Sequence, residues 1–426
     1  MDKKQIKYYL PIIIFMLIQN FISNELFFII GLIYVCYNIF LNNKMKIFKP
    51  FKEYSILIIF LIWGFILGLI NIVLGDTNKN DFFRDIFYFV NPLVYIYIGA
   101  MYAKNNVDIY KIFNSFIISG TILSLLSFVN ILLNISSLNM AFTVQAWRDI
   151  SGDGIMVASI AMAIIFSKTI PKEERMSKKV IIVATIIMLL QFLITLSRTN
   201  IMILIIMYTI FILNDKDYKK VLKNILITTS FIGILLFSFY KILPSSISQN
   251  FLNKILDSSK EISAKHKWDT LAEIQGNWRG YETYCAKEEW KKSDGINQII
   301  GNGFGKRIYV GTYAFDLLKQ VDYSGNKADS IPVLHNGYFT MLIKLGVLGM
   351  MLYVIFYLLI INKAVKNIKK YPNNIYGKTL LSIGIILLIM TYFLNGLYKD
   401  YCFYPIIILL GYTAFYVQYF EQKEKK

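Results

Sequence analysis

The chain has 426 residues, of which 56% are hydrophobic and 17% charged, with a formal net charge of +18 and a mean hydropathy of +0.51. This composition excludes a soluble globular protein and predicts a polytopic membrane protein. A large basic excess is also typical of nucleic-acid-binding proteins, so the positions of the charges along the chain decide what the excess means.

Apolar segments recur along the whole chain, and most have a length that can cross a hydrocarbon core of about 30 Å as a helix. They predict an all-α membrane protein with about twelve transmembrane helices. The segments are residues 8–22, 25–41, 54–75, 86–103, 110–134, 154–168, 180–196, 200–213, 221–243, 337–361, 379–395 and 401–420.

Lysine and arginine are distributed unevenly between alternate connections of these segments. With the N-terminus inside, the cytoplasmic segments hold 26 of them, and the five short outer loops hold only five. This positive-inside pattern predicts a multi-pass membrane protein with both termini in the cytoplasm. We expect helices 1–9 in residues 1–243, a long extracytoplasmic loop at 244–335 and helices 10–12 in 336–426. Because topology explains the net charge, no nucleic-acid partner is expected.

Arg198 is the only formal charge in the 35 residues between Lys179 and Asp215, which include LLQFLITLSRTNIMILIIMY. A single helix of that length would be about 53 Å long, far more than a membrane needs, whereas a break at Ser197–Asn200 gives two pieces of about 17 residues. The break predicts a helical hairpin with Arg198 at the outer surface. One tilted span would instead bury the arginine at high cost. Taken alone, Arg198 is best explained as an interfacial arginine that extends its charge from the helix to the membrane surface and has no role in function.

The long loop 244–335 has the size of a soluble unit, and its sequence predicts short helices. In NWRGYETYCAKEEWKK, the residues Arg279, Ala286 and Trp290 fall on nearly one helical face. The next motif, IIGNGFGKR, has three glycines typical of tight turning. A glycine-rich loop can also cradle a phosphate, but no predicted strand precedes this one, so a dinucleotide site is not favoured.

The chain has two histidines, His266 and His335, and both lie in the predicted outer loop. His335 stands where the loop enters the next helix, with Asn336 and Tyr338 beside it, and we count these two neighbours as candidate substrate-binding residues. A neutral imidazole can take a proton from a hydroxyl, so His335 is a candidate general base. A helix-capping histidine is the alternative. His266 has only charged neighbours and is not a candidate.

Three motifs occur in a fixed order: LITLSRTN at the start of one span, Arg279 and Trp290 followed by GNGFG in the loop, and HNGYFTMLIKLGVLG entering the next span. In this order the chain resembles the O-antigen polymerase/ligase superfamily, over roughly residues 180–360 in motifs and over the whole chain in topology. The resemblance implies an integral glycosyltransferase of the GT-C type that acts on undecaprenyl-diphosphate-linked glycans at the outer face of the bacterial cytoplasmic membrane, with 244–335 as its extracytoplasmic catalytic loop. It also implies that Arg198 and Arg279 bind the pyrophosphate and that His335 is catalytic. Many members carry an acidic residue where this chain has Lys344.

The residue types agree with this chemistry. Arginine offers a permanent charge and bidentate hydrogen bonds to a pyrophosphate at headgroup depth, and fixed guanidinium groups can stabilise the charge that grows on the leaving phosphate. The outer segments contain no DxD motif and no clustered metal ligands, so we expect neither a metal nor another cofactor. Arg84 is either a third cationic contact to the substrate or an ion-pair partner of Asp81 or Asp85, and the pairing is favoured.

The favoured function is a polymerase for O-antigen or another surface polysaccharide, with lipid-linked repeat units as both donor and acceptor. Membrane lipids and a chain-length regulator protein are further expected partners. The alternative is a ligase that moves the glycan to a lipid A core or another acceptor. A flippase for the same lipid-linked unit is less favoured, because a transporter usually places its functional charges near the midplane of the membrane and keeps its outer loops short.

Overall fold

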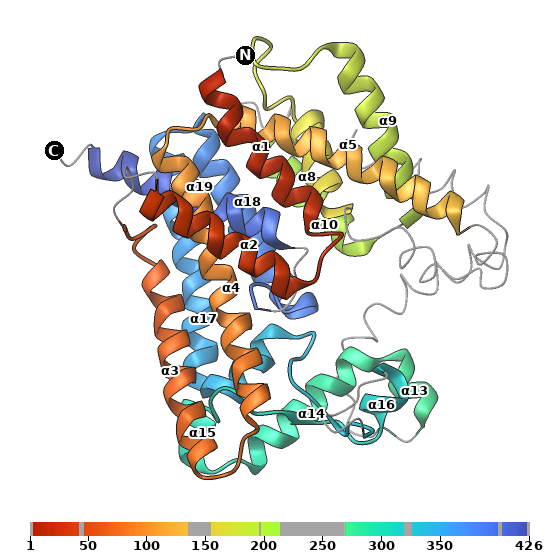
Figure 1. The fold of residues 1–426 in the computed structure, drawn as a ribbon, viewed down its shortest axis with the longest axis vertical. Helices are drawn as coiled ribbons and strands as arrows, with labels where there is room; N and C mark the ends of the chain where they lie inside the picture. Colours follow the sequence, from red (N-terminus) through yellow and green to blue (C-terminus); the bar gives the residue numbers. More distant parts are fainter. Residues whose placement is uncertain are drawn as a thin grey trace.

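The computed structural model describes residues 3–41, 47–134, 155–195, 197–213, 268, 270–318, 326–398 and 403–423, and these are mostly helical (Figure 1). Helices lie at eleven of the twelve apolar segments expected from the sequence. The segment 221–243 and His266 fall outside the described residues. Six described helices are long and apolar enough to cross a membrane, by length and composition: Tyr54–Val73, Lys79–Lys104, Ile109–Leu133, Lys178–Thr195, Gly337–Lys370 and Ile375–Leu394. The count of about twelve spans stays a prediction.

The helices before the long loop, in chain order, are α1 (Lys3–Ile18), α2 (Asn24–Cys36), the π-helix η1 (Tyr37–Leu41), α3 (Tyr54–Val73), α4 (Lys79–Lys104), α5 (Ile109–Leu133), α8 (Ile155–Phe166), α9 (Lys178–Thr195) and α10 (Arg198–Ile212). The helices after the loop are α17 (Gly337–Lys370), α18 (Ile375–Leu394) and α19 (Tyr404–Lys423). Figure 1 shows α3, α4 and α17 running side by side, with α5, α8, α9 and α10 gathered toward the other side of the molecule.

The centre of the bundle is the pair formed by α4 and α19, which pack together along their length. Gly99 of α4 and Gly411 of α19 allow this close approach. A Cβ atom at Gly99 would lie 2.0 Å from the carbonyl oxygen of Ile408, and one at Gly411 would lie 2.0 Å from that of Ile96. Small residues at such crossings let two helix backbones come into contact.

The long apolar run around Arg198 is broken, as predicted, but the break lies just before the predicted turn at Ser197–Asn200, because Arg198 to Asn200 already belong to a helix. Helix α9 ends at Thr195, and α10 begins at Arg198 after Ser197, whose backbone is extended. The two helices also have different neighbours, since α9 packs on α5 and α8 whereas α10 packs on α8 and α18. The single tilted helix is therefore excluded.

Helix α17 is kinked at Gly346, which has a φ of 69°. The kink frees the carbonyl groups of Ile343 and Lys344, which accept hydrogen bonds from the backbone N–H groups of Asn302 (3.0 Å) and Gly303 (2.8 Å). The predicted helix at 337–361 is thus two helical pieces joined at a glycine, and the glycine-rich loop occupies the joint.

The glycine-rich loop is inserted between α3, α4 and α17. Gly301, Gly303 and Gly305 all have positive φ, and a Cβ atom at Gly303 would lie 2.4 Å from the backbone nitrogen of Gly68 on α3. Phe304 is fully buried and donates its backbone N–H to the carbonyl of Gly64 at 3.0 Å. Because the amide groups of 302–305 bond to the protein itself, this loop is a packing element and does not offer them to a phosphate.

The described part of the long loop contains four short helices and one pair of short antiparallel strands, which the all-α expectation missed. The helices are α13 (Leu271–Gly276), α14 (Trp278–Lys292), α15 (Gly295–Ile300) and α16 (Tyr313–Leu318), and the strands are β1 (Ile308–Tyr309) and β2 (Ser330–Ile331). They form their own small core around Ala286, Ile308 and Leu334, which continues to Ile343 of α17. Figure 1 shows α13, α14 and α16 grouped beside one end of α17.

Candidate functional site

His335 is held on three sides where the loop enters α17. Its backbone N–H donates to Oε2 of Glu282 at 3.0 Å, and its carbonyl accepts from the backbone N–H of Asn395 at 2.6 Å. Its ring Nδ1 lies 2.9 Å and 3.0 Å from the two carboxylate oxygens of Glu282. Asn395 also donates its side-chain amide to the carbonyl of Leu334 at 3.0 Å. The end of α18 and the helix α14 therefore fix this histidine in place.

Glu282 determines how the imidazole can act. The carboxylate is buried, with its side chain 1% exposed, whereas the side chain of His335 is 30% exposed. A carboxylate can only accept a hydrogen bond, so the neutral ring carries its proton on Nδ1. Nε2 is then left with a lone pair. The same carboxylate stabilises the imidazolium after Nε2 has taken a proton, because opposite charges then lie in contact. This arrangement suits a general base.

Glu282 is a candidate functional residue that the sequence analysis missed, although a signal was present. Arg279, Glu282, Ala286 and Trp290 are spaced by three or four residues, which places them on one face of α14. Ala286 is fully buried against the core of the loop. A glutamate that is buried on the same face as Ala286 needs a partner, and His335 supplies it.

Arg279 shares the helix α14 with Glu282, and Arg198 begins a different helix, α10. Arg279 lies one turn before Glu282 on α14 and is partly exposed. Arg198 is the first residue of α10, which packs on α18. The amine of Lys378 near the start of α18 donates to the carbonyl of Phe211 near the end of α10 at 3.0 Å. The end of α10 therefore lies at the start of α18. We infer that Arg198, at the start of α10, lies toward the end of α18, where Asn395 bonds to His335.

Asn336 and Tyr338 have structural contacts of their own. The side-chain oxygen of Asn336 caps α17 by accepting the backbone N–H groups of Tyr338 (3.1 Å) and Phe339 (3.4 Å). The hydroxyl of Tyr338 donates to the carbonyl of Leu388 on α18 at 2.6 Å. Both contacts fix the start of α17 and hence the position of His335. The helix cap that the sequence analysis considered for His335 belongs to Asn336, and direct substrate contacts from Asn336 and Tyr338 stay predictions.

Arg84 forms an ion pair with Asp81, which agrees with the pairing considered from the sequence. Arg307, which follows the glycine-rich loop, also contacts Asp81, at 3.0 Å. A substrate contact from Arg84 stays a prediction.

Lys344 lies about 10 Å along α17 from Gly337, at about 1.5 Å per residue. It is buried and paired with Asp85, whose Oδ2 also accepts the backbone N–H of Gly305 at 2.6 Å. Leaving either of two buried partners alone typically costs about 3–5 kcal/mol. This pair joins α4, α17 and the glycine-rich loop, and gives Lys344 a structural role.

Cys285 is the one cysteine in the sequence of the long loop, and a thiol can act as a nucleophile. Its thiol packs beside the small core of the loop, and burial raises the pKa of Cys285 to about 11. A thiol with this pKa is protonated at neutral pH and is a poor nucleophile. Within the described part of the chain, no three His, Cys, Asp or Glu side chains are grouped so that they could hold a metal ion.

No protein-family model matches the chain, and neither does any curated protein.

Proposed function

We propose that the chain is a glycosyltransferase that polymerises lipid-linked repeat units of a surface polysaccharide. The observation that carries the proposal is the pair of His335 and buried Glu282 at the entrance to a membrane-length helix, one helical turn from Arg279. An oriented base at the point where a helix meets a loop domain, held by a helix that also carries a permanent cation, suits a substrate with a hydroxyl acceptor and a diphosphate leaving group.

In the proposed reaction, the oxygen of an acceptor hydroxyl attacks the anomeric carbon of the donor glycan. The hydroxyl proton moves to Nε2 of His335, and Glu282 stabilises the imidazolium that results. The bond between the anomeric carbon and the diphosphate oxygen breaks, and its electron pair leaves with undecaprenyl diphosphate. Arg279 and Arg198 bind that diphosphate and stabilise its growing charge. The products are a longer lipid-linked glycan and one free undecaprenyl diphosphate for each bond formed.

The test is reconstitution of the purified protein in liposomes with a single lipid-linked repeat unit labelled in its sugar. A polymerase produces a ladder of lipid-linked glycans and releases one undecaprenyl diphosphate per added unit. A ligase produces no ladder and transfers the label only after a lipid A core is added. If neither product forms and the labelled lipid only changes leaflet, the proposal is wrong and a flippase is the better account.

A further inference from the structure

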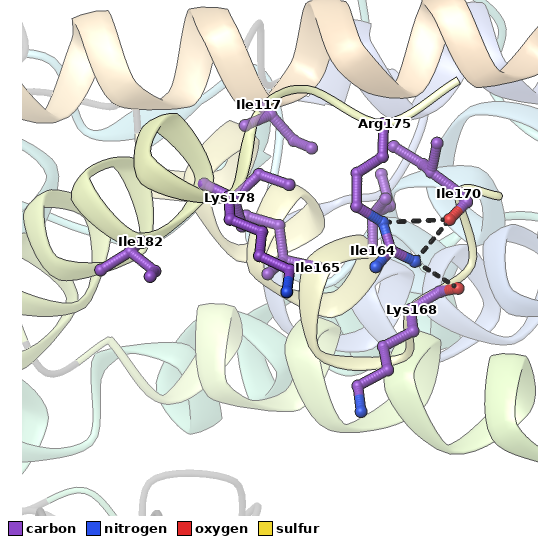
Figure 2. Close-up of a pocket in the computed structure, with 9 residues that line it drawn as sticks. Ile117, Ile164, Ile165, Lys168, Ile170, Arg175, Lys178 and Ile182 are labelled. Atoms are coloured by element: carbon purple, nitrogen blue, oxygen red, sulfur yellow. Dashed lines mark hydrogen bonds between the residues drawn. The ribbon is translucent and has the colours of Figure 1, made fainter. Parts of the chain in front are cut away.

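A pocket of about 230 Å³ lies between α5, α8 and α9, away from the histidine site. Figure 2 shows Lys168, Arg175 and Lys178 around Ile164 and Ile165. The other lining residues are Ile117, Ile170, Ile181 and Ile182. The pocket thus combines three cations with a wall made of isoleucine.

The connection between α8 and α9 has a defined conformation that shapes this pocket. The guanidinium of Arg175 donates through Nη2 to the carbonyls of Ile170 (2.6 Å) and Lys168 (3.3 Å), and through Nε to that of Ile170 (3.2 Å). Asn114 of α5 donates its amide to the carbonyl of Glu174 at 2.8 Å, which ties the connection to the bundle. The backbone that carries Lys168 is therefore held in place before any ligand binds.

The positive charge at the pocket is not neutralised by the surrounding protein. Lys168 and Lys178 are exposed and form no ion pair with any residue that the structure describes. Glu173 and Glu174 are exposed on the same connection and likewise pair with none of the three cations in the described ranges. A ligand with an anionic group would complement this charge.

The apolar surroundings indicate that the ligand also has a hydrocarbon part. Ile181 and Ile182 carry the pocket wall onto α9. Further along this helix, Val183, Ile186 and Leu190 remain about half exposed. A second groove, almost wholly apolar, lies between α5 and α9 and includes Ile118, Ile122 and Val183. A free phosphate would use none of this surface.

We propose that this pocket binds an anionic phospholipid. Its phosphate lies between Lys168, Arg175 and Lys178, and its acyl chains follow the exposed apolar face of α9. Basic pockets between membrane helices are known to take anionic headgroups, because the cations attract the phosphate while the helices pack against the chains. The positive-inside pattern places this connection in the cytoplasm, so the lipid would come from the inner leaflet. The site is independent of the proposed glycosyltransferase activity.

Native mass spectrometry of the purified protein tests this proposal with two lipids that have identical acyl chains, phosphatidylglycerol and phosphatidylcholine. We expect the wild type to retain one phosphatidylglycerol under conditions that remove phosphatidylcholine. Lys168→Gln combined with Lys178→Gln should weaken this binding about 30-fold, which corresponds to about 1 kcal/mol for each lysine near an anionic group.

The matched control is Lys172→Gln combined with Lys366→Gln, which removes the same charge from exposed positions that do not line the pocket. It should retain phosphatidylglycerol as the wild type does. Equal retention of the two lipids by the wild type would overturn the proposal, and so would unchanged binding by the Lys168/Lys178 variant. Competition by inorganic phosphate at the same concentration as the lipid would show an anion site without lipid selectivity, which also contradicts it. The lipid comparison and the phosphate competition need no variant, so they remain decisive if a substitution impairs folding.

Discussion

Replacing Glu282 by glutamine removes the negative charge beside His335 while it keeps the size of the side chain. The carboxylate lies 2.9 Å from Nδ1 of His335 and is almost completely buried. Opposite unit charges about 4 Å apart attract by about 4 kcal/mol at an effective dielectric constant of about 20. Solvent screens part of this attraction, because the side chain of His335 is 30% exposed. We therefore expect the barrier to rise by about 3–4 kcal/mol, which slows bond formation roughly 100- to 1,000-fold.

The assay is the rate of repeat addition to a lipid-linked unit, measured for equal amounts of folded protein. Donor binding should change little, because Glu282 contacts the base and not the diphosphate. A second readout is the tautomer of His335, seen by nitrogen NMR of the histidines. The chain has only two, so His266→Ala assigns the signals. The wild type should carry its proton on Nδ1, whereas glutamine can present either its oxygen or its amide and should allow both tautomers.

Glu288→Gln is the matched control, because Glu288 lies on the same helix, has a side chain that is 37% exposed, and pairs only with the surface residue Lys291 among the described residues, at 2.9 Å. Its rate should stay within about twofold of the wild type, since a surface pair contributes little. A full rate from a folded Glu282→Gln variant would refute the reasoning. Glu282 would then only anchor the backbone N–H of His335, which a glutamine oxygen can also do.

Three further predictions concern the arginines, the glycine-rich loop and the buried thiol. Arg198→Lys and Arg279→Lys should each weaken binding of the diphosphate donor about 10- to 100-fold at normal expression, because lysine cannot form the bidentate contact. Donor affinities that match the wild type would show that only the charge matters. Gly303→Ala should lower the free energy of unfolding by about 2–5 kcal/mol, since its positive φ and the nearby backbone both oppose a Cβ atom. Gly295→Ala, where no atom lies within 4 Å of the added Cβ, is the control, and equal midpoints of thermal unfolding would contradict the packing role. With the other two cysteines replaced by serine, Cys285 should react with an alkylating reagent at neutral pH about 100-fold more slowly than a thiol of ordinary pKa near 9. The rate should rise toward pH 11. A fast reaction at pH 7 would show that the thiol is not buried.

The helices could be predicted from the sequence because hydrophobicity and length are local properties of a segment. A break at Ser197–Asn200 followed from arithmetic on the length of a span, and the structure has a break close by, between Thr195 and Arg198. The pairing of Arg84 with Asp81 was also accessible, since residues three apart on a helix are neighbours.

The tertiary partners of the charged residues could not be predicted in the same way. Glu282 and His335 are 53 positions apart, and Lys344 and Asp85 are 259 apart. No local pattern relates such distant positions without homologous sequences. The kink at Gly346 was missed for a similar reason, because it depends on the glycine-rich loop that packs into it.

The central claim is that His335 is the general base of a glycan polymerisation, and His335→Ala tests it most directly. The measurement is the length of the glycan ladder made from a lipid-linked repeat unit by purified variants, together with binding of the donor. Loss of a positioned base typically slows a reaction by about 100- to 10,000-fold. The account predicts that His335→Ala binds the donor but makes no ladder, while His266→Ala makes the full ladder. A full ladder from His335→Ala would contradict the claim and leave His335 as a residue that only joins α14 to α17.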